Sequence, residues 1–314
     1  MVRVVLQLSA LLCVTVSSAK AGPRNLGADL QNLDVRLNSD HYALAGTASD
    51  ARLNEFAAAL EFIHAEYAAG FAELLADQNR NPQADARSDA QAAPESAAAK
   101  TPASDRFSVV VLAKEGEYKE FTHAYFNNQL EHTRGLFVPS VDLLVILDIG
   151  NTSETYATLF QEAFHQFLHR HVPLAPMWVN EGLATYYETA RPTGAGLVFD
   201  RPRDLFFQVV KEAADAKLLI SFDALLSADR SAFYDSTALP GMRFPRSVLH
   251  YAQAYTLCAF IVNDGEGRLV LRRYLQSLAG ARGEKDVLRI TRESFPPSLL
   301  EALVAPWLQY VNKY

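Results

Sequence analysis

Strand-like and helix-like patterns lie in different halves of this 314-residue chain. Short strand-like runs occur before residue 150, at residues 34–37, 41–44, 107–112 and 141–147. Beyond residue 151, nearly every patterned stretch has the three- and four-residue spacing of an amphipathic helix. Strands followed by helices predict an α+β fold, in which a small N-terminal mixed sheet precedes a mainly helical half.

The helices can be placed from their apolar periodicity. One long helix is expected among the strands, over residues 51–76, because large apolar residues recur there on one side. The later helices are expected at residues 153–170, 176–189, 203–217, 247–262, 268–278 and 297–311. Hydrophobic residues make up 49% of the chain and charged residues 21%, which is enough to bury a substantial core.

The first 21 residues have the pattern of a signal peptide. A single charge at Arg3 is followed by a mainly apolar run over residues 4–16 and by small residues that end in Ala19-Lys20-Ala21. The run is shorter than the ~20 apolar residues that span a bilayer, so we expect no stable membrane insertion after cleavage. The sequence therefore predicts an exported protein, periplasmic or extracellular.

The remaining chain, residues 22–314, is predicted to form one domain. Residues 77–105 contain no large apolar side chain, and we expect them to be a disordered Ala/Pro/Ser-rich insertion in that domain. After cleavage Cys258 is the only cysteine, so an intrachain disulfide is excluded and the fold must rely on its core. The formal net charge of −7 disfavours nucleic acid as a partner.

The predicted helix over residues 153–170 has two different faces. Apolar residues fill one face, and the other carries a polar stripe of Gln161, Glu162, His165, Gln166 and His169. Taken alone, this stripe is typical of a solvated helix face. It also holds the residue types of a metal-dependent hydrolase, since imidazoles bind metal ions and a carboxylate can accept a proton.

A second segment favours the chemical interpretation. Residues 178–187 (W-V-N-E-G-L-A-T-Y-Y) place Glu181 on a following helix, sixteen residues after His165. Together the two segments resemble an uncharacterised bacterial family of gluzincin-type metallopeptidases, a family of unknown function. Its members pair an H-E-x-x-H helix with a helix of the form P-x-W-x-x-E-G-L-A. The resemblance extends to residues 39–42, 135–139 and 251–255, and so covers most of the mature chain.

This resemblance implies a zincin-like helical half and a zinc peptidase site. In gluzincins the two histidines of the H-E-x-x-H helix bind zinc, and its glutamate is the general base. A glutamate from a later helix is the third ligand. Carried onto this chain, the pattern makes His165 and Glu181 ligands and Glu162 the base. Tyr251 is the best match for the donor that stabilises the oxyanion.

The chain departs from the family pattern at the first ligand position. Gln161 stands where the family has a histidine, and a neutral amide is a poor zinc ligand, so we expect weak or absent Zn²⁺ binding. A shifted frame, His165 with His169, restores two histidines one turn apart but puts Gln166 where the base should be. A composite site of His165, His169 and Glu181 would have the right residue types without the family geometry.

Two functions remain open from the sequence. The first is an exported metallopeptidase-like hydrolase that acts on peptides or a related amide in the cell envelope, with impaired zinc binding. The second is a pseudo-peptidase, a non-catalytic protein that binds a peptide or a cell-wall component. In either case the expected partner is a peptide or an envelope substrate, and Gln161, Glu162, His165 and Glu181 are expected to converge.

Overall fold

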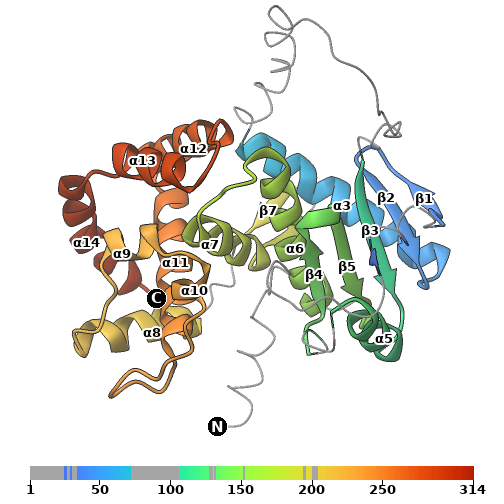
Figure 1. The fold of residues 1–314 in the computed structure, drawn as a ribbon, viewed down its shortest axis with the longest axis horizontal. Coiled ribbons are helices and arrows are strands. Elements are labelled where there is room, and N and C mark those ends of the chain that lie inside the picture. Colours follow the sequence, from blue (N-terminus) through green and yellow to red (C-terminus); the bar gives the residue numbers. More distant parts are fainter. Residues whose placement is uncertain are drawn as a thin grey trace, which may run out of the picture.

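The computed structural model describes residues 25, 26, 29, 34–71, 106–126, 130, 132–150, 153–193, 196–199 and 204–314. The predicted signal peptide, residues 1–21, and the predicted insertion, residues 77–105, lie outside the described residues. The expected α+β organisation is confirmed. A mixed sheet near the N-terminal side is followed by a helical half, and the two lie side by side in Figure 1.

The sheet combines a parallel centre with antiparallel edges. Its strands are β1 (Leu37–Asn38), β2 (Tyr42–Gly46), β3 (Phe107–Leu112), β4 (Gly135–Val138) and β5 (Leu143–Leu147), in the order β1-β2-β3-β5-β4. β2, β3 and β5 are parallel, whereas β1 and β4 pair antiparallel with their neighbours. The strand predicted at residues 34–37 is wrong for most of its length, because pairing with β2 begins only near its end. β4 has only four residues and was not predicted as a strand.

Both faces of the sheet are covered by helices. Val109 and Val111 of β3 belong to the main core, in which helices α3 (Asp50–Gly70) and α6 (Ser153–His171) contact the sheet. Val110 and Leu112 point the other way, into a smaller core beneath helix α5 (Glu115–Phe126). This two-residue alternation explains why the strands read as nearly continuous apolar runs.

The helical half is built around a central pair of helices. After α6 come α7 (Met177–Glu188), α8 (Asp204–Asp215), α9 (Phe222–Ser227), α10 (Arg230–Phe233), α11 (Arg246–Asn263), α12 (Gly265–Ala279), α13 (Glu284–Ser294) and α14 (Pro297–Val311). A small hairpin, β6 (Arg191–Thr193) and β7 (Gly196–Val198), follows α7. The helices predicted at residues 153–170, 176–189, 203–217, 247–262, 268–278 and 297–311 are all present, with ends that differ by at most three residues. The helix predicted at residues 51–76 is α3, which ends at Gly70.

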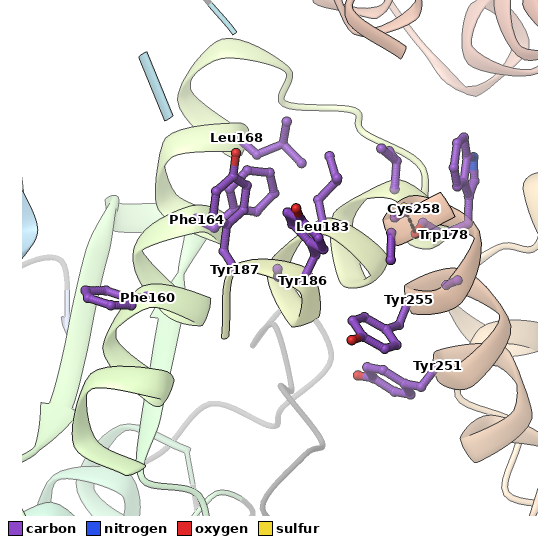
Figure 2. Close-up of a cluster of buried hydrophobic side chains, with 14 of the residues drawn as sticks. Phe160, Phe164, Leu168, Trp178, Leu183, Tyr186, Tyr187, Tyr251, Tyr255 and Cys258 are labelled. Carbon is purple, nitrogen blue, oxygen red and sulfur yellow. Dashed lines mark hydrogen bonds between the residues drawn. The ribbon is translucent and has the colours of Figure 1, made fainter. Parts of the chain in front are cut away.

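Helix α7 lies between α6 and α11, and this arrangement positions the candidate site. Figure 2 shows aromatic and aliphatic side chains from all three helices in one buried cluster. Gly182 allows α7 to approach α11 closely, because a Cβ there would lie 2.6 Å from the carbonyl oxygen of Ala254 and from Sγ of Cys258. Within the described residues, no helix combines the length and apolar character needed to cross a bilayer.

Candidate metal site between helices α6 and α7

The polar stripe of α6 is buried. Gln161, Glu162, His165 and Gln166 are exposed by 4%, 2%, 1% and 0% respectively, so the solvated-face interpretation is wrong. The spacing of polar residues shows which side of a helix is polar, but it does not show which other elements cover that side. In this fold β4, β5 and α7 all pack on α6. The contact with β4 is close, since a Cβ on Gly135 would lie 3.1 Å from Cγ of Glu162.

His165 of α6 and Glu181 of α7 face each other inside the protein. The Nε2 atom of His165 lies 3.9 Å from Oε2 of Glu181, and both side chains are buried. This distance is too long for a hydrogen bond. Neither atom has a hydrogen-bond partner among the residues that the structure describes. The two residues that sequence analysis paired as ligands are therefore neighbours, and two unsatisfied polar atoms meet between them.

Asn180 holds one ring nitrogen of His165, and the other ring nitrogen points toward Glu181. Nδ1 of His165 lies 3.0 Å from Oδ1 of Asn180. Because an amide oxygen only accepts hydrogen bonds, Nδ1 carries a proton and donates it to Asn180. Nε2, the other ring nitrogen, is the atom directed at the Glu181 carboxylate. Histidines that bind metal ions are commonly oriented in this way by a partner on the other ring nitrogen.

The other carboxylate oxygen of Glu181 is held by a tyrosine. The hydroxyl of Tyr234 donates a hydrogen bond of 2.7 Å to Oε1. Burial raises the pKa of Glu181, while His165, the hydroxyls of Tyr234 and Tyr251, and the charge of Arg230 act in the opposite direction. Burial is the largest of these effects. The neighbours of Glu181 therefore favour its ionised form without fully offsetting the cost of removing a charge from water.

The gap between His165 and Glu181 suits a metal ion. Zinc bonds to imidazole nitrogen and carboxylate oxygen at about 2.0–2.2 Å in a tetrahedral arrangement, so two of its ligand atoms lie about 3.4 Å apart, roughly half an ångström less than the observed 3.9 Å. These two residues fit a zinc ion. Gln161 does not complete the set, because its amide is neutral and zinc sites use imidazole, thiolate or carboxylate almost exclusively. Nε2 of Gln161 is buried and has no hydrogen-bond partner in the described part of the chain.

The shifted frame is not supported by the geometry. Gln166 is occupied elsewhere, since its Nε2 donates to the carbonyl oxygens of Ser108 and Asp142 and so ties α6 to the sheet. The ring of His169 packs against Phe137 on β4. Within the described ranges, no three or more His, Cys, Asp or Glu side chains gather in a way that could hold a metal ion. His169 therefore does not join His165 and Glu181 in a cluster of that kind.

Tyr251, the residue expected as oxyanion donor, lies near Glu181. It is 4% exposed on α11, its ring packs against Phe233, and it is one of the two tyrosines whose hydroxyls lower the pKa of Glu181. Figure 2 shows its side chain directed from α11 toward α7. His250, the preceding residue, is also buried, and burial lowers the pKa of its imidazole.

Sequence analysis missed two residues of the site. Asn180 was visible as the residue before Glu181, but only the structure shows that it contacts His165. Tyr234 follows the four-residue helix α10 in a stretch without periodicity, about fifty residues beyond Glu181 in the chain. No local pattern marks it, because only the packing of α10 beside α7 and α11 brings it to the carboxylate.

Comparison with known proteins adds no further constraint. No protein-family model matches the chain, and no curated protein matches it. The likeness to gluzincins therefore depends on the residues themselves: the stripe on α6, the Glu181 segment on α7 and the approach of His165 to Glu181.

Proposed function

We propose that this chain is an exported, gluzincin-like metallopeptidase-family protein that acts on peptides or a related amide in the cell envelope, with zinc binding weakened by Gln161. The observation that carries the proposal is the approach of His165 Nε2 to Glu181 Oε2 at 3.9 Å, with both atoms buried and unsatisfied among the described residues. A purely structural pair would be expected to close into a hydrogen bond, because an unmade bond in the interior costs about 1–3 kcal/mol.

The remaining roles follow from position and chemical type. His165 and Glu181 would hold the metal, and Asn180 would orient His165. Zinc supplies an activated water and a polarised carbonyl in peptidases of this kind. Glu162 would take the proton, since it is a buried carboxylate one turn from His165 on the same helix. The hydroxyl of Tyr251 would donate to the developing oxyanion.

The alternative is a pseudo-peptidase that binds a peptide or a cell-wall component without cleaving it. One observation favours it: only two residues of the usual zinc-ligand types, His165 and Glu181, face each other here, whereas catalytic zinc sites have three protein ligands. Both candidate functions share the same fold and the same pair, and they differ in whether the site retains enough affinity to hold a metal ion.

The discriminating experiment is the zinc content of the purified mature protein, measured beside a Gln161→His variant. We expect the unmodified protein to contain little zinc and the variant to bind it substantially more tightly, because imidazole then replaces an amide one turn before His165. Peptidase activity that appears with zinc in the variant would support the hydrolase ancestry. A correctly folded Gln161→His protein that still binds no zinc would contradict the proposal.

A further inference from the structure

Four buried polar side chains occupy matching positions on helices α6 and α7. Gln161 and His165 are one turn apart on α6, and Glu181 and Thr185 are one turn apart on α7. Side chains four residues apart lie next to each other on the same side of a helix. Because His165 faces Glu181 across the interface, Gln161 and Thr185 each lie beside one member of this pair.

Each of these side chains has a polar atom without a hydrogen-bond partner among the residues that the structure describes. The atoms are Nε2 of Gln161, Nε2 of His165, Oε2 of Glu181 and Oγ1 of Thr185. All four residues are buried, so bulk solvent does not satisfy these atoms. Buried polar groups in folded proteins nearly always have a partner, either another protein group or an ordered water. Four such atoms at one helix contact therefore point to a bound molecule that supplies the partners.

The separation of the central pair fits one water molecule. Nε2 of His165 and Oε2 of Glu181 are 3.9 Å apart, which is too far for a direct hydrogen bond. A water oxygen about 2.8 Å from each atom reaches both at once. A separation of more than about 3.5 Å between two polar atoms leaves room for such a bridge.

Water also matches the chemistry of the four atoms. The amide nitrogen of Gln161 donates hydrogen bonds, the carboxylate oxygen of Glu181 accepts them, and the hydroxyl of Thr185 can do either. The bound molecule must therefore both accept and donate, as water does, whereas a simple anion only accepts. Buried waters typically make about three hydrogen bonds, and these side chains offer enough partners for that number.

We propose that a buried water molecule bridges His165 and Glu181 while no metal ion is bound there. The amide of Gln161 and the hydroxyl of Thr185 are its further partners. This inference goes beyond the proposed function and does not assume that zinc binds. It gives Gln161 a role of its own, because the amide holds water at the position where the family has a metal-binding histidine. The two helices then pack around a polar pair without needing a metal ion.

The direct test is a crystal structure of the full mature chain, with diffraction data collected on both sides of the zinc absorption edge. We expect an electron-density peak within about 3.2 Å of both Nε2 of His165 and Oε2 of Glu181, without an anomalous signal at the zinc edge. Absence of a peak at this position would overturn the inference. A peak with a zinc signal would overturn it too, because a metal ion would then join the pair.

A second test is the stability of the variants Thr185→Val and Gln161→Met, measured by thermal unfolding of the full mature chain in the presence of a metal chelator. Both substitutions nearly keep the size of the side chain and remove its polar atom. If these atoms bond to the buried water, each change should lower the unfolding midpoint by about 2–4 °C. An unchanged or raised midpoint in either variant would overturn the inference, since removing a polar atom that has no partner does not destabilise a protein.

Thr122→Val on α5 is the matched control. Thr122 is also buried, but its hydroxyl donates to the carbonyl oxygen of Lys119 in its own helix. If one water joins Gln161 and Thr185, Thr185→Val should have a smaller effect in the Gln161→Met background. Thr122→Val should have the same effect in both backgrounds. Full additivity of the Gln161 and Thr185 changes would contradict a shared water.

The inference and the proposed function can fail separately. Absence of a bridging water refutes only the hydration site. Zinc binding by Gln161→His still decides whether the space between His165 and Glu181 can be a metal site, because that variant replaces the amide with an imidazole.

Discussion

Gly182 of α7 faces the backbone of Ala254 across the α7–α11 interface, which leaves no room for a Cβ on Gly182. A Cβ at this position would lie 2.6 Å from the Ala254 carbonyl oxygen and 2.6 Å from Cys258 Sγ. The obstacle on one side is backbone, which cannot rotate away. Gly182 also follows Glu181, so the distance between these helices fixes the depth at which the carboxylate is buried.

Gly182→Ala should therefore destabilise the protein by about 1–3 kcal/mol, the usual cost of overpacking a core. The measurement is urea or thermal unfolding followed by circular dichroism. Gly116→Ala on α5 is the control, because a Cβ there meets nothing within 4 Å. The control should be neutral or slightly stabilising, by up to about 1 kcal/mol. Equal stabilities for the two variants would show that α7 and α11 can separate without cost.

Sequence patterns predicted a sheet followed by a helical half, and the resemblance to gluzincins implied that His165 and Glu181 lie close together. The strand β3 and the helix α14 have the predicted bounds: β3 is a nearly continuous apolar run, and the apolar residues of α14 recur with a helical period. Glu181 could be identified as a candidate ligand because the residues around it in the sequence form a distinctive motif. Local patterns could not predict that the polar side of α6 is buried, since burial is decided by which distant element covers it.

The parts that escaped prediction are short or depend on contacts between distant segments. β4 has four residues, too few to show an alternation, yet it covers Glu162 through Gly135. Helix α13 was not predicted either, because it has only three apolar residues, Val287, Leu288 and Ile290, and buries only Ile290 of them. Tyr234 reaches Glu181 through tertiary packing alone. The pairing of Asn180 with His165 likewise depends on the relative rotation of α6 and α7.

Asn180 should control zinc affinity without contacting zinc. In the Gln161→His background, Asn180→Ala removes the acceptor that holds the Nδ1 proton of His165, so the ring loses its fixed tautomer and orientation. Zinc affinity should fall about 10–100-fold, the usual effect of losing such a partner. Competition with a chelator measures it. Asn180→Asp keeps an acceptor and should retain the affinity. An unchanged affinity in Asn180→Ala would mean that His165 is oriented by packing alone.

Two stacked histidines, His41 just before β2 and His64 on α3, should make stability depend on pH. The rings of His41 and His64 are stacked with centroids 3.9 Å apart, and His64 also packs against Phe107 and Phe167. Burial, together with the charge of His41, lowers the pKa of His64 to about 4. Glu61 acts in the opposite direction without cancelling the effect, and Arg170 adds to the lowering.

The sign of the effect follows from proton uptake. Between pH 6.5 and pH 4 the unfolded chain protonates His64 while the folded chain does not, so the free energy of unfolding decreases as the pH falls through this window. At about 1.4 kcal/mol per pKa unit, His64 contributes at most about 3 kcal/mol to this loss. Urea unfolding of His64→Phe should show a shallower pH dependence. As a control, His132→Gln changes an exposed histidine and should leave the pH dependence of the unfolding free energy unaltered. If His132→Gln made this pH dependence as shallow as His64→Phe does, the effect would not be due to His64.

The final prediction concerns Glu162, in the background where Gln161→His restores the family ligand. Glu162→Gln should abolish any peptidase activity while zinc remains bound, because the change removes the proton acceptor but no ligand. Zinc content and peptide hydrolysis, measured on the same preparations, separate the two effects. Loss of zinc together with activity would make Glu162 part of the metal site or of the fold instead of the base. If the unmodified protein contains stoichiometric zinc that is lost on His169→Ala, the ligands come from His165 and His169, and the assignment of Gln161 as the degenerate ligand position is wrong.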